Sequence, residues 1–300
     1  MGFWGLVLSL GTAGLWAASP LLLRLGMVGV APDEVNPVRS LGFWGASAIL
    51  LFALDPGSLI PPAPGRVGLP LFANVLLGNI LGDVLYFAAI RQIGVSRAVA
   101  VSSSYPLVVT LISVLWLGER PSLLALAATG VIVAGLVLLR LEPRESEVHR
   151  RLPLRGYLWA LTAALCWGLS IPLTKWLVTT GGFTPLGVNF WRSSLLVMLA
   201  WSIWLLQTRG RPDLRGQIRR VPLRSWAALA GAGAAGLALG GFAFALALTL
   251  APASLVTPIT AASPLLTALV ATLFLGDRLR PYQWGGIVLV ALGSAAIGLS

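Results

Sequence analysis

The chain has 300 residues, of which 57% are hydrophobic and only 10% are charged, and its mean hydropathy is +0.88. Soluble proteins carry about 25% charged residues, so this composition excludes a soluble globular protein and predicts an integral membrane protein. The net charge of +11 comes from 21 basic and 10 acidic residues. Because the basic residues cluster in short segments beside apolar stretches, they indicate membrane orientation and exclude a nucleic-acid partner.

Apolar stretches of about 20 residues, enough to cross about 30 Å of hydrocarbon, recur along the chain. Their length and their lack of alternation exclude a closed barrel, so α-helices must satisfy the backbone in lipid. We predict an all-α protein with ten transmembrane helices, near residues 3–25, 36–54, 68–90, 97–117, 121–140, 156–178, 186–206, 225–248, 254–275 and 281–299.

The chain contains an internal duplication. Residues 86–120 recur 158 positions later at 244–278, and each copy has a serine ten residues before a proline and ends in a Gly-acid-Arg turn. Five helices per half would insert the halves in opposite directions, which is the inverted-repeat plan of secondary transporters. The matched residues of the two halves are Trp16 and Trp167, Arg24 and Lys175, Arg39 and Arg192, Ser96 and Ser254, Pro106 and Pro264, and Glu119 and Asp277. We expect a first repeat at 1–140, a basic linker at 141–155 and a second repeat at 156–300.

These paired elements resemble the two EamA domains of the drug/metabolite transporter superfamily. The resemblance rests on the Trp-to-cation segments, the two Asn-x-x-Arg helix starts and the paired Pro-Leu and Leu-Gly-acid-Arg elements, and it covers nearly the whole chain. It implies a ten-helix basket around a central cavity in the bacterial cytoplasmic membrane, mostly serving export of amino acids, sugars, nucleotide derivatives or drugs. A small-molecule substrate and membrane lipid are the expected partners, and a monomer or weak dimer is the expected assembly.

The third predicted helix is the richest in polar residues. Asn79, Asp83 and Tyr86 are spaced to lie on one helix face. Polar groups at the midplane of a membrane are costly, so each is a candidate for substrate binding. Asp83 is the only acid well inside a predicted span. It fits either a proton-coupling carboxylate or a partner for a cationic substrate, and equally an acid toward the helix end that is hydrated or paired with Arg91 or Arg97.

Two prolines, Pro106 and Pro264, fall at the middle of the fourth and ninth predicted helices. Each follows a hydroxyl-rich stretch, which includes Ser104 and Tyr105 in the first half and Ser263 in the second. A proline frees a backbone carbonyl that hydroxyl groups or water can satisfy. We expect polar kinks at substrate depth, which serve as gating elements or as packing kinks.

Trp16 and Trp167 lie near the centres of their helices, where an indole N–H needs a partner or a wet face. They are candidates to line the cavity and stack on substrate, or else to pack between the halves, and Ser170 lies one turn beyond Trp167. Lys175 is a candidate anion contact, with snorkelling to the headgroups as the alternative. For Arg39 and Arg192, salt bridges or headgroup contacts are the expected roles beside anion contacts.

An intramembrane enzyme needs a constellation of His, Cys, paired acids or metal ligands in its spans. The sequence has one His in a loop, one Cys and one deep acid, so we expect no enzyme and no cofactor. No P-loop is present, so the energy must come from a gradient, from exchange or from an ion such as a proton. We predict a secondary transporter of small metabolites, most consistent with amino acids, working by alternating access with export as the expected direction. The alternatives are a flippase for lipid or lipid-linked substrates and an exporter of cationic drugs that uses Asp83.

The basic residues predict the orientation. Arginines cluster at 140–155 and at 208–224. If both segments are cytoplasmic, as the positive-inside bias indicates, both termini face outward. A reporter fused after Ser300 should therefore be found outside the cytosol, and a cytosolic reporter would contradict this orientation.

Overall fold

The computed structural model describes residues 2–27, 30, 32–93, 95–139, 154–210, 221–275 and 281–299, and these residues contain helices and no strand. The turn at Gly276-Asp277-Arg278, nearly all of the linker at 141–155 and most arginines of the 208–224 loop lie outside these ranges.

Helices occupy all the segments that the sequence predicts. In the first half they are α1 (Phe3–Gly26), α2 (Pro32–Leu54), a short 3-10 turn η1 (Pro56–Leu59), α3 (Pro64–Val75), the π-helical η2 (Leu76–Leu81), α4 (Gly82–Ile93), α5 (Val95–Ser102), α6 (Tyr105–Leu117) and α7 (Leu123–Leu139). In the second half they are α8 (Leu154–Thr179), α9 (Pro185–Gln207), α11 (Leu223–Ala232), the π-helical η3 (Gly233–Leu239), α12 (Gly240–Leu250), α13 (Ala253–Thr260), α14 (Ser263–Leu275) and α15 (Pro281–Gly298).

The helices have the length and composition of membrane spans. Within the described part of the chain, six helical stretches are long and apolar enough to cross a bilayer, at 3–23, 34–54, 64–93, 154–179, 185–207 and 223–250, and shorter apolar helices lie at 105–117, 123–138 and 253–267. Large apolar side chains also cover the outside, with Leu111 57% and Leu123 85% exposed. The structure therefore has the all-helical membrane class that we predicted, while the number of ten crossings stays a prediction.

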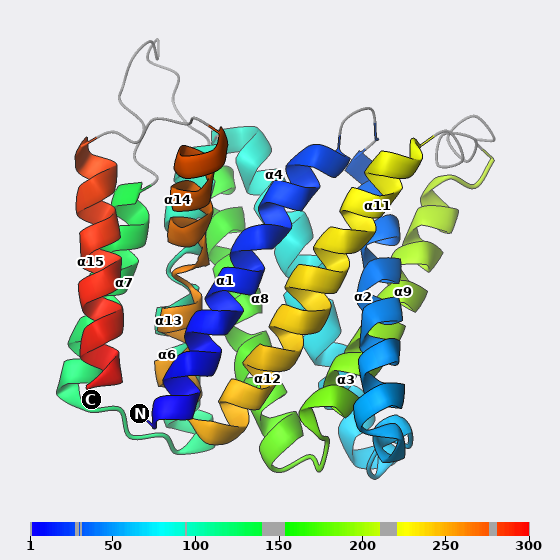
Figure 1. Ribbon diagram of the computed structural model, residues 1–300, viewed down its shortest axis with the longest axis horizontal. Helices are drawn as coiled ribbons and strands as arrows, with labels where there is room; N and C mark the ends of the chain where they lie inside the picture. Colours follow the sequence, from blue (N-terminus) through cyan, green and yellow to red (C-terminus); the bar gives the residue numbers. More distant parts are fainter. Residues whose placement is uncertain are drawn as a thin grey trace.

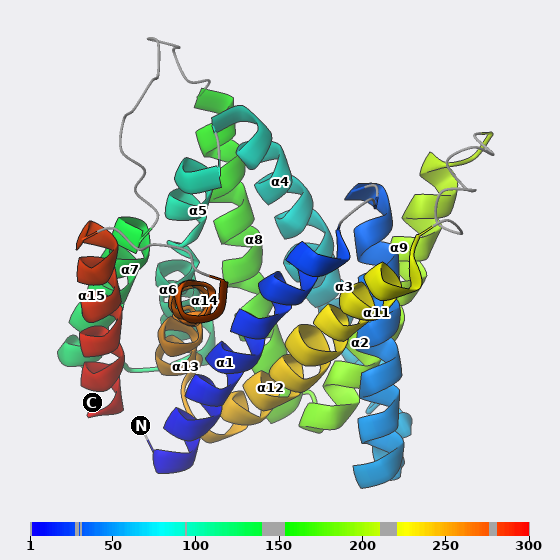
Figure 2. The ribbon, with the colours of Figure 1, turned by 45° about the horizontal axis from the view of Figure 1, so that its top comes forward.

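The two halves run in opposite directions and interlock. In Figure 1, α1 begins at the lower end of the bundle beside the N-terminus, whereas its counterpart α8 begins at the upper end. The first helix of each half packs against the third helical stretch of the other half: α1 against α11, η3 and α12, and α8 against α3, η2 and α4. At one side, α7 and α15 pack against each other (Figures 1 and 2).

The interlocking depends on glycines in the two π-helical regions, which lie at repeat-related positions. Gly78 and Gly82 recur 158 residues later as Gly236 and Gly240. A Cβ atom at Gly240 would lie 2.7 Å from Trp16, and one at Gly78 would lie 2.8 Å from the Ser170 hydroxyl. Gly82 meets Trp167 and Gly236 meets Ser19 in the same way. None of the four positions has room for a side chain. The glycines therefore let α1 approach η3 and α12 as closely as α8 approaches η2 and α4.

Both predicted proline kinks are present as interruptions of the helix. Residues 103–104 separate α5 from α6, and residues 261–262 separate α13 from α14. Pro106 and Pro264 are each the second residue of the helix that follows, where a missing N–H removes no intrahelical hydrogen bond. Figure 2 shows the consequence in the second half, where α14 is seen end-on and α13 is not.

Contacts between the halves close the lower end of the bundle. There α6 packs against α13, and Val109, Phe244, Leu248 and Val256 belong to one buried apolar cluster. Below this cluster Glu119, only 7% exposed, reaches from the end of α6 to the first residues of α13.

Glu119 is a cap for a helix of the other half. Its carboxylate accepts hydrogen bonds from the backbone N–H groups of Ala253 (2.7 Å) and Ser254 (2.9 Å) and from the Ser254 hydroxyl (2.6 Å). Lys175 Nζ lies 3.7 Å from Glu119 Oε1 and donates to the carbonyls of Leu248 (3.0 Å) and Ala251 (2.6 Å). The predicted turn at Gly118 does end α6, with φ of 69°. Its acid, however, stabilises the N-terminus of α13 in the other half.

A second polar link joins the halves beside η1. Asp55 accepts hydrogen bonds from the hydroxyls of Ser58 (2.5 Å) and Thr184 (2.8 Å), and Thr184 also caps α9 through the Gly187 N–H (3.0 Å). These two hydroxyl donors hold the pKa of Asp55 below its usual value. Because the folded-state pKa is lowered, the link is present at neutral pH and weakens as the pH falls through that pKa.

The upper end lacks an equivalent closure. The repeat counterparts of α6 and α13 are α14 and α5, and in the described residues these two make no packing comparable to that of α6 with α13. Figure 2 shows α5 and α14 apart, with α4, α5 and α8 on one side and α1 and α14 on the other. The halves therefore meet more closely at the lower end than at the upper.

We expect Glu119→Ala to destabilise the protein by about 1–2 kcal/mol, because it leaves the α13 amides uncapped and Lys175 without its counter-ion. Thermal unfolding in detergent measures this, and Glu119→Gln, which keeps one acceptor, should fall between the two. The matched control is Arg120→Ala, since Arg120 is the exposed neighbour of Glu119. Equal midpoints for Glu119→Ala and Arg120→Ala would contradict the capping role.

Candidate functional site

A cavity of about 250 Å³ lies between the two halves, lined by residues of α1, α2, η2, α6, α8, α9, η3 and α12. Both π-helical segments contribute to the wall, through Gly78 and Asn79 in η2 and Gly236 and Leu237 in η3. π-helical turns inside α-helices are often found at functional sites. The cavity is thus built around the same irregular segments that hold the halves together.

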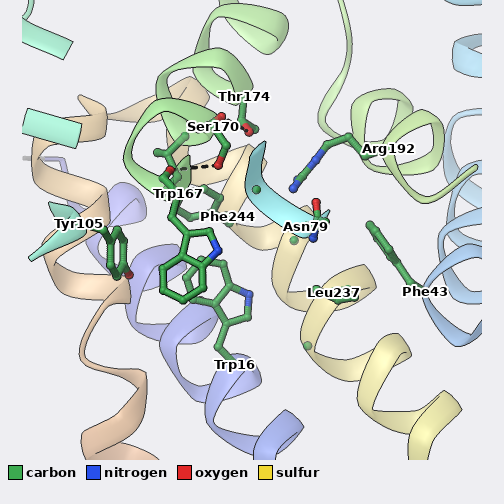
Figure 3. Close-up of a pocket in the computed structure, with 14 residues that line it drawn as sticks. Trp16, Phe43, Asn79, Tyr105, Trp167, Ser170, Thr174, Arg192, Leu237 and Phe244 are labelled. Atoms are coloured by element: carbon green, nitrogen blue, oxygen red, sulfur yellow. Dashed lines mark hydrogen bonds between the residues drawn. The ribbon is translucent and has the colours of Figure 1, made fainter. Parts of the chain in front are cut away.

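One side of the cavity is aromatic. Trp16, Tyr105, Trp167 and Phe244 line it, and Figure 3 shows them grouped together. The ring of Trp16 lies 5.1 Å from that of Phe244, and the ring of Tyr105 meets Trp167 edge-on at 6.2 Å. These spacings are typical of packed aromatic pairs, so the rings form a preorganised apolar surface.

Asp83 does not line the cavity, but it contacts Trp167 of the aromatic side. Its carboxylate accepts a hydrogen bond from the Trp167 indole and interacts electrostatically with Arg39 of α2. Tyr86, one turn further along α4, packs its ring 5.3 Å from that of Trp167. The cation that faces Asp83 is therefore Arg39, where the sequence suggested Arg91 or Arg97, and the carboxylate orients an indole of the cavity.

The polar side of the cavity contains Asn79, Arg192, Ser170 and Thr174. Ser170 donates to the Trp167 carbonyl (3.0 Å) and Thr174 to the Ser170 carbonyl (3.2 Å), so both hydroxyl protons are used within α8. By contrast, Asn79 Oδ1 and Arg192 Nε are buried and have no hydrogen-bond partner. In Figure 3 the Arg192 side chain extends from α9 toward Asn79. These two groups are the ones available to a ligand.

The structure brings together only part of the predicted set. Trp16, Asn79, Tyr105, Trp167 and Ser170 line the cavity. The other predicted contacts lie elsewhere: Asp83 and Tyr86 behind the Trp167 wall, Ser104 and Ser263 at the helix interruptions, and Lys175 at the closed end. Their predicted roles in substrate binding stay predictions, as do the gating roles of Pro106 and Pro264.

The sequence did not assign several lining residues to the cavity, above all Arg192, Phe43 and Thr174. A signal for Arg192 was present, because it matches Arg39 in the repeat, but nothing in the pattern distinguished the surroundings of the two arginines. The described residues bring no three His, Cys, Asp or Glu side chains together as a metal site would need.

The comparisons with known proteins agree with this architecture. A model of the EamA-like transporter family matches residues 3–141 and 154–299. A protein of Archaeoglobus fulgidus named as an uncharacterized transporter is 26% identical over 289 residues, which cover 96% of this chain and 95% of that protein. A crystal structure with 17% identity matches 98% of this chain and 96% of its own chain with a TM-score of 0.78, which shows the shared fold. Because the family model spans both halves, the chain belongs to the EamA-like transporter family and is a multi-pass membrane transporter, not an enzyme.

Proposed function

We propose that this protein is a secondary transporter that moves small amphipathic metabolites, most consistent with amino acids, by alternating access. The observation that carries the proposal is a central cavity that both halves line, closed at one end by contacts between the halves. A site at the interface of inverted repeats is where secondary transporters bind their substrates.

The lining supports a small, partly apolar substrate. A volume of about 250 Å³ lies below the range of roughly 300–1,000 Å³ that is typical of sites for drug-sized ligands. Among the described residues Arg192 is the only lining side chain with a formal charge. A lone cation in the cavity wall repels cationic drugs. Phosphates are bound by clusters of Arg or Lys, so one arginine does not make a phosphate site.

The repeats support the alternation. Contacts that close the lower end join α6 of the first half to α13 of the second, and the equivalent elements α14 and α5 flank the upper end. If α5 and α14 came together at the upper end while α6 and α13 separated at the lower end, the cavity would close on one side of the membrane and open on the other. The helix interruptions before Pro106 and Pro264 are suited to this motion, because they separate α5 from α6 and α13 from α14.

Charge supports a direction of transport. Most of the clustered arginines lie in the sequence between α7 and α8 and between α9 and α11, and Figure 1 shows that α7 and α9 end, and α8 and α11 begin, at the upper end of the bundle, opposite the termini. With the positive-inside bias, this end faces the cytoplasm of a bacterial cell and the cavity is placed to load from inside. This arrangement supports export.

Counterflow in liposomes tests the proposal. Purified protein should accumulate labelled solute when the liposomes are preloaded with unlabelled amino acids, and not when they hold sugars or nucleotide precursors. We expect Trp167→Ala and Asn79→Ala each to lower the rate about tenfold, because each removes a contact worth about 1 kcal/mol or more in the cavity.

Trp4→Ala is the matched control, since Trp4 is a tryptophan of the same protein that is 68% exposed near the start of α1. Loss of rate in this control would show a general effect of removing indoles. If folded wild-type protein moves none of these solutes, the secondary-transporter proposal is wrong and flipping of lipid-linked substrates is the function to test next.

Proton coupling through Asp83 forms the second part of the proposal. Protonation of this carboxylate would weaken its contacts with Arg39 and with the Trp167 indole, and so would loosen the aromatic wall. We expect Asp83→Asn to abolish the dependence of transport on a pH gradient while exchange without a gradient persists. Counterflow with and without a gradient measures this, and an unchanged dependence in Asp83→Asn would exclude coupling at this residue.

A further inference from the structure

Two arginines at equivalent positions of the repeat have different electrostatic surroundings. Arg39 belongs to Asn36-Pro-Val-Arg39 in the second turn of α2, and Arg192 to Asn189-Phe-Trp-Arg192 in the second turn of α9. Arg39 interacts with the carboxylate of Asp83. The residue 158 positions after Asp83 is Gly241, so the second half has no acid at the place where the first half has one.

At Gly241 no side chain fits beside the cavity. Gly241 and Arg192 both line it, and a Cβ atom at Gly241 would lie 2.7 Å from the Oδ1 atom of Asn189, one turn before Arg192 on α9. Asn189 itself is held by hydrogen bonds to Ser47 (3.2 Å) and to the Ala238 carbonyl (2.9 Å). The second half therefore has a fixed neutral amide, and no acid, at this position, and Arg192 lines the cavity next to it.

Arg192 has no partner of its own in the described residues. No carboxylate pairs with it, and its Nε atom is buried without a hydrogen bond. The Nε of Arg39 also lacks a hydrogen bond, but the charge of Arg39 is compensated by Asp83. An uncompensated cation at membrane depth is costly, and such residues usually mark a binding site for an opposite charge.

The other lining residues indicate the chemistry of the ligand that would carry this negative charge. Asn79 Oδ1, buried and without a partner, lies on the polar side with Arg192. Figure 3 shows these two residues on one side of the cavity and Trp16, Tyr105 and Trp167 on the other. A ligand that satisfies both sides has an anionic end and an apolar body.

We propose that Arg192 binds the carboxylate of the transported solute, in the part of the cavity that Arg192 lines together with Asn79. The apolar body of the solute then lies against Trp16 and Trp167, and Asn79 accepts a hydrogen bond from an ammonium or hydroxyl group beside the carboxylate. One guanidinium binds a carboxylate in a two-point hydrogen bond and balances its single charge. A phosphate ester carries about two negative charges and is bound by clusters of Arg or Lys, so a lone Arg192 favours a monocarboxylate. This assignment rests on the proposed transport function and narrows its substrate class.

The test compares solutes that have a carboxylate with solutes that have an amide or a phosphate in its place. The probes are phenylalanine and leucine, their amides, 3-phenylpropionate and glycerol phosphate, each assayed by counterflow with purified protein in liposomes. We expect the wild type to carry the amino acids and 3-phenylpropionate at least tenfold faster than the amides or glycerol phosphate. In Arg192→Gln, transport of the carboxylates should fall roughly ten- to hundredfold, because a charge-assisted hydrogen bond is lost.

The controls separate binding from folding. Arg209→Gln removes an exposed arginine just beyond the end of α9 and should behave as the wild type. Arg192→Gln should keep or raise the midpoint of thermal unfolding, since it removes an uncompensated buried charge, whereas Arg39→Gln should lower it because Asp83 loses its partner. Arg192→Lys keeps the charge and should retain the preference for carboxylates over amides, which tests the proposal even if the glutamine variant does not fold.

Each outcome is decisive. Equal transport of carboxylates by the wild type and Arg192→Gln, faster transport of the amides or of glycerol phosphate by the wild type, or a marked loss of stability in both Arg192 variants would overturn the assignment. A wild-type protein that carries sugars but none of the carboxylates would overturn it and leave the transport function standing. Failure to carry any solute would contradict the transport function itself.

Discussion

The close approach of each half's first helix to the glycines of the other half is the contact on which the remaining structure depends. Trp16 lies on Gly240 and Trp167 on Gly82, at distances that exclude a Cβ atom. Both glycines adjoin π-helical segments, whose wider turns expose side chains and backbone that a regular α-helix would cover. The same contacts thus hold the halves together, aim two indoles into the centre of the bundle and leave the cavity between them.

Burial of charge explains the polar features around this frame. In a membrane interior an ion must find a counter-ion or a set of hydrogen bonds. Lys175 lies beside Glu119 and donates to two carbonyls, and Arg39 interacts with Asp83. The first pair links α8 to the end of α6, and the second links α2 to α4, so the charges also stabilise the packing of these helices. Arg192 is the described buried cation for which the protein supplies no such partner.

The scaffold is symmetric and the cavity lining is not. Glycines, prolines and tryptophans recur at equivalent positions because both halves must fold and pack in the same way. Asn79, whose counterpart in the second half is Leu237, and Asp83, whose counterpart is Gly241, break the symmetry in the cavity wall and next to it. A symmetric frame allows the two ends of the bundle to take equivalent roles, whereas an asymmetric lining allows one site to select one orientation of a small ligand.

The sequence by itself determined the membrane class, the duplication, the helical segments and the central tryptophans, because hydropathy, repeats and proline positions are local properties of the chain. It also predicted the interruptions at Pro106 and Pro264. It did not determine the surroundings of matched residues. Arg39 and Arg192 look alike in the pattern, and only the tertiary structure shows that Asp83, 44 residues after Arg39, compensates one of them while the other lines the cavity without an acid beside it. Likewise, Glu119 belongs to a turn that the sequence explains as a helix end, yet its carboxylate caps a helix 134 residues away. Such contacts depend on how helices that are far apart in the sequence pack against each other, and a local sequence pattern does not predict that packing.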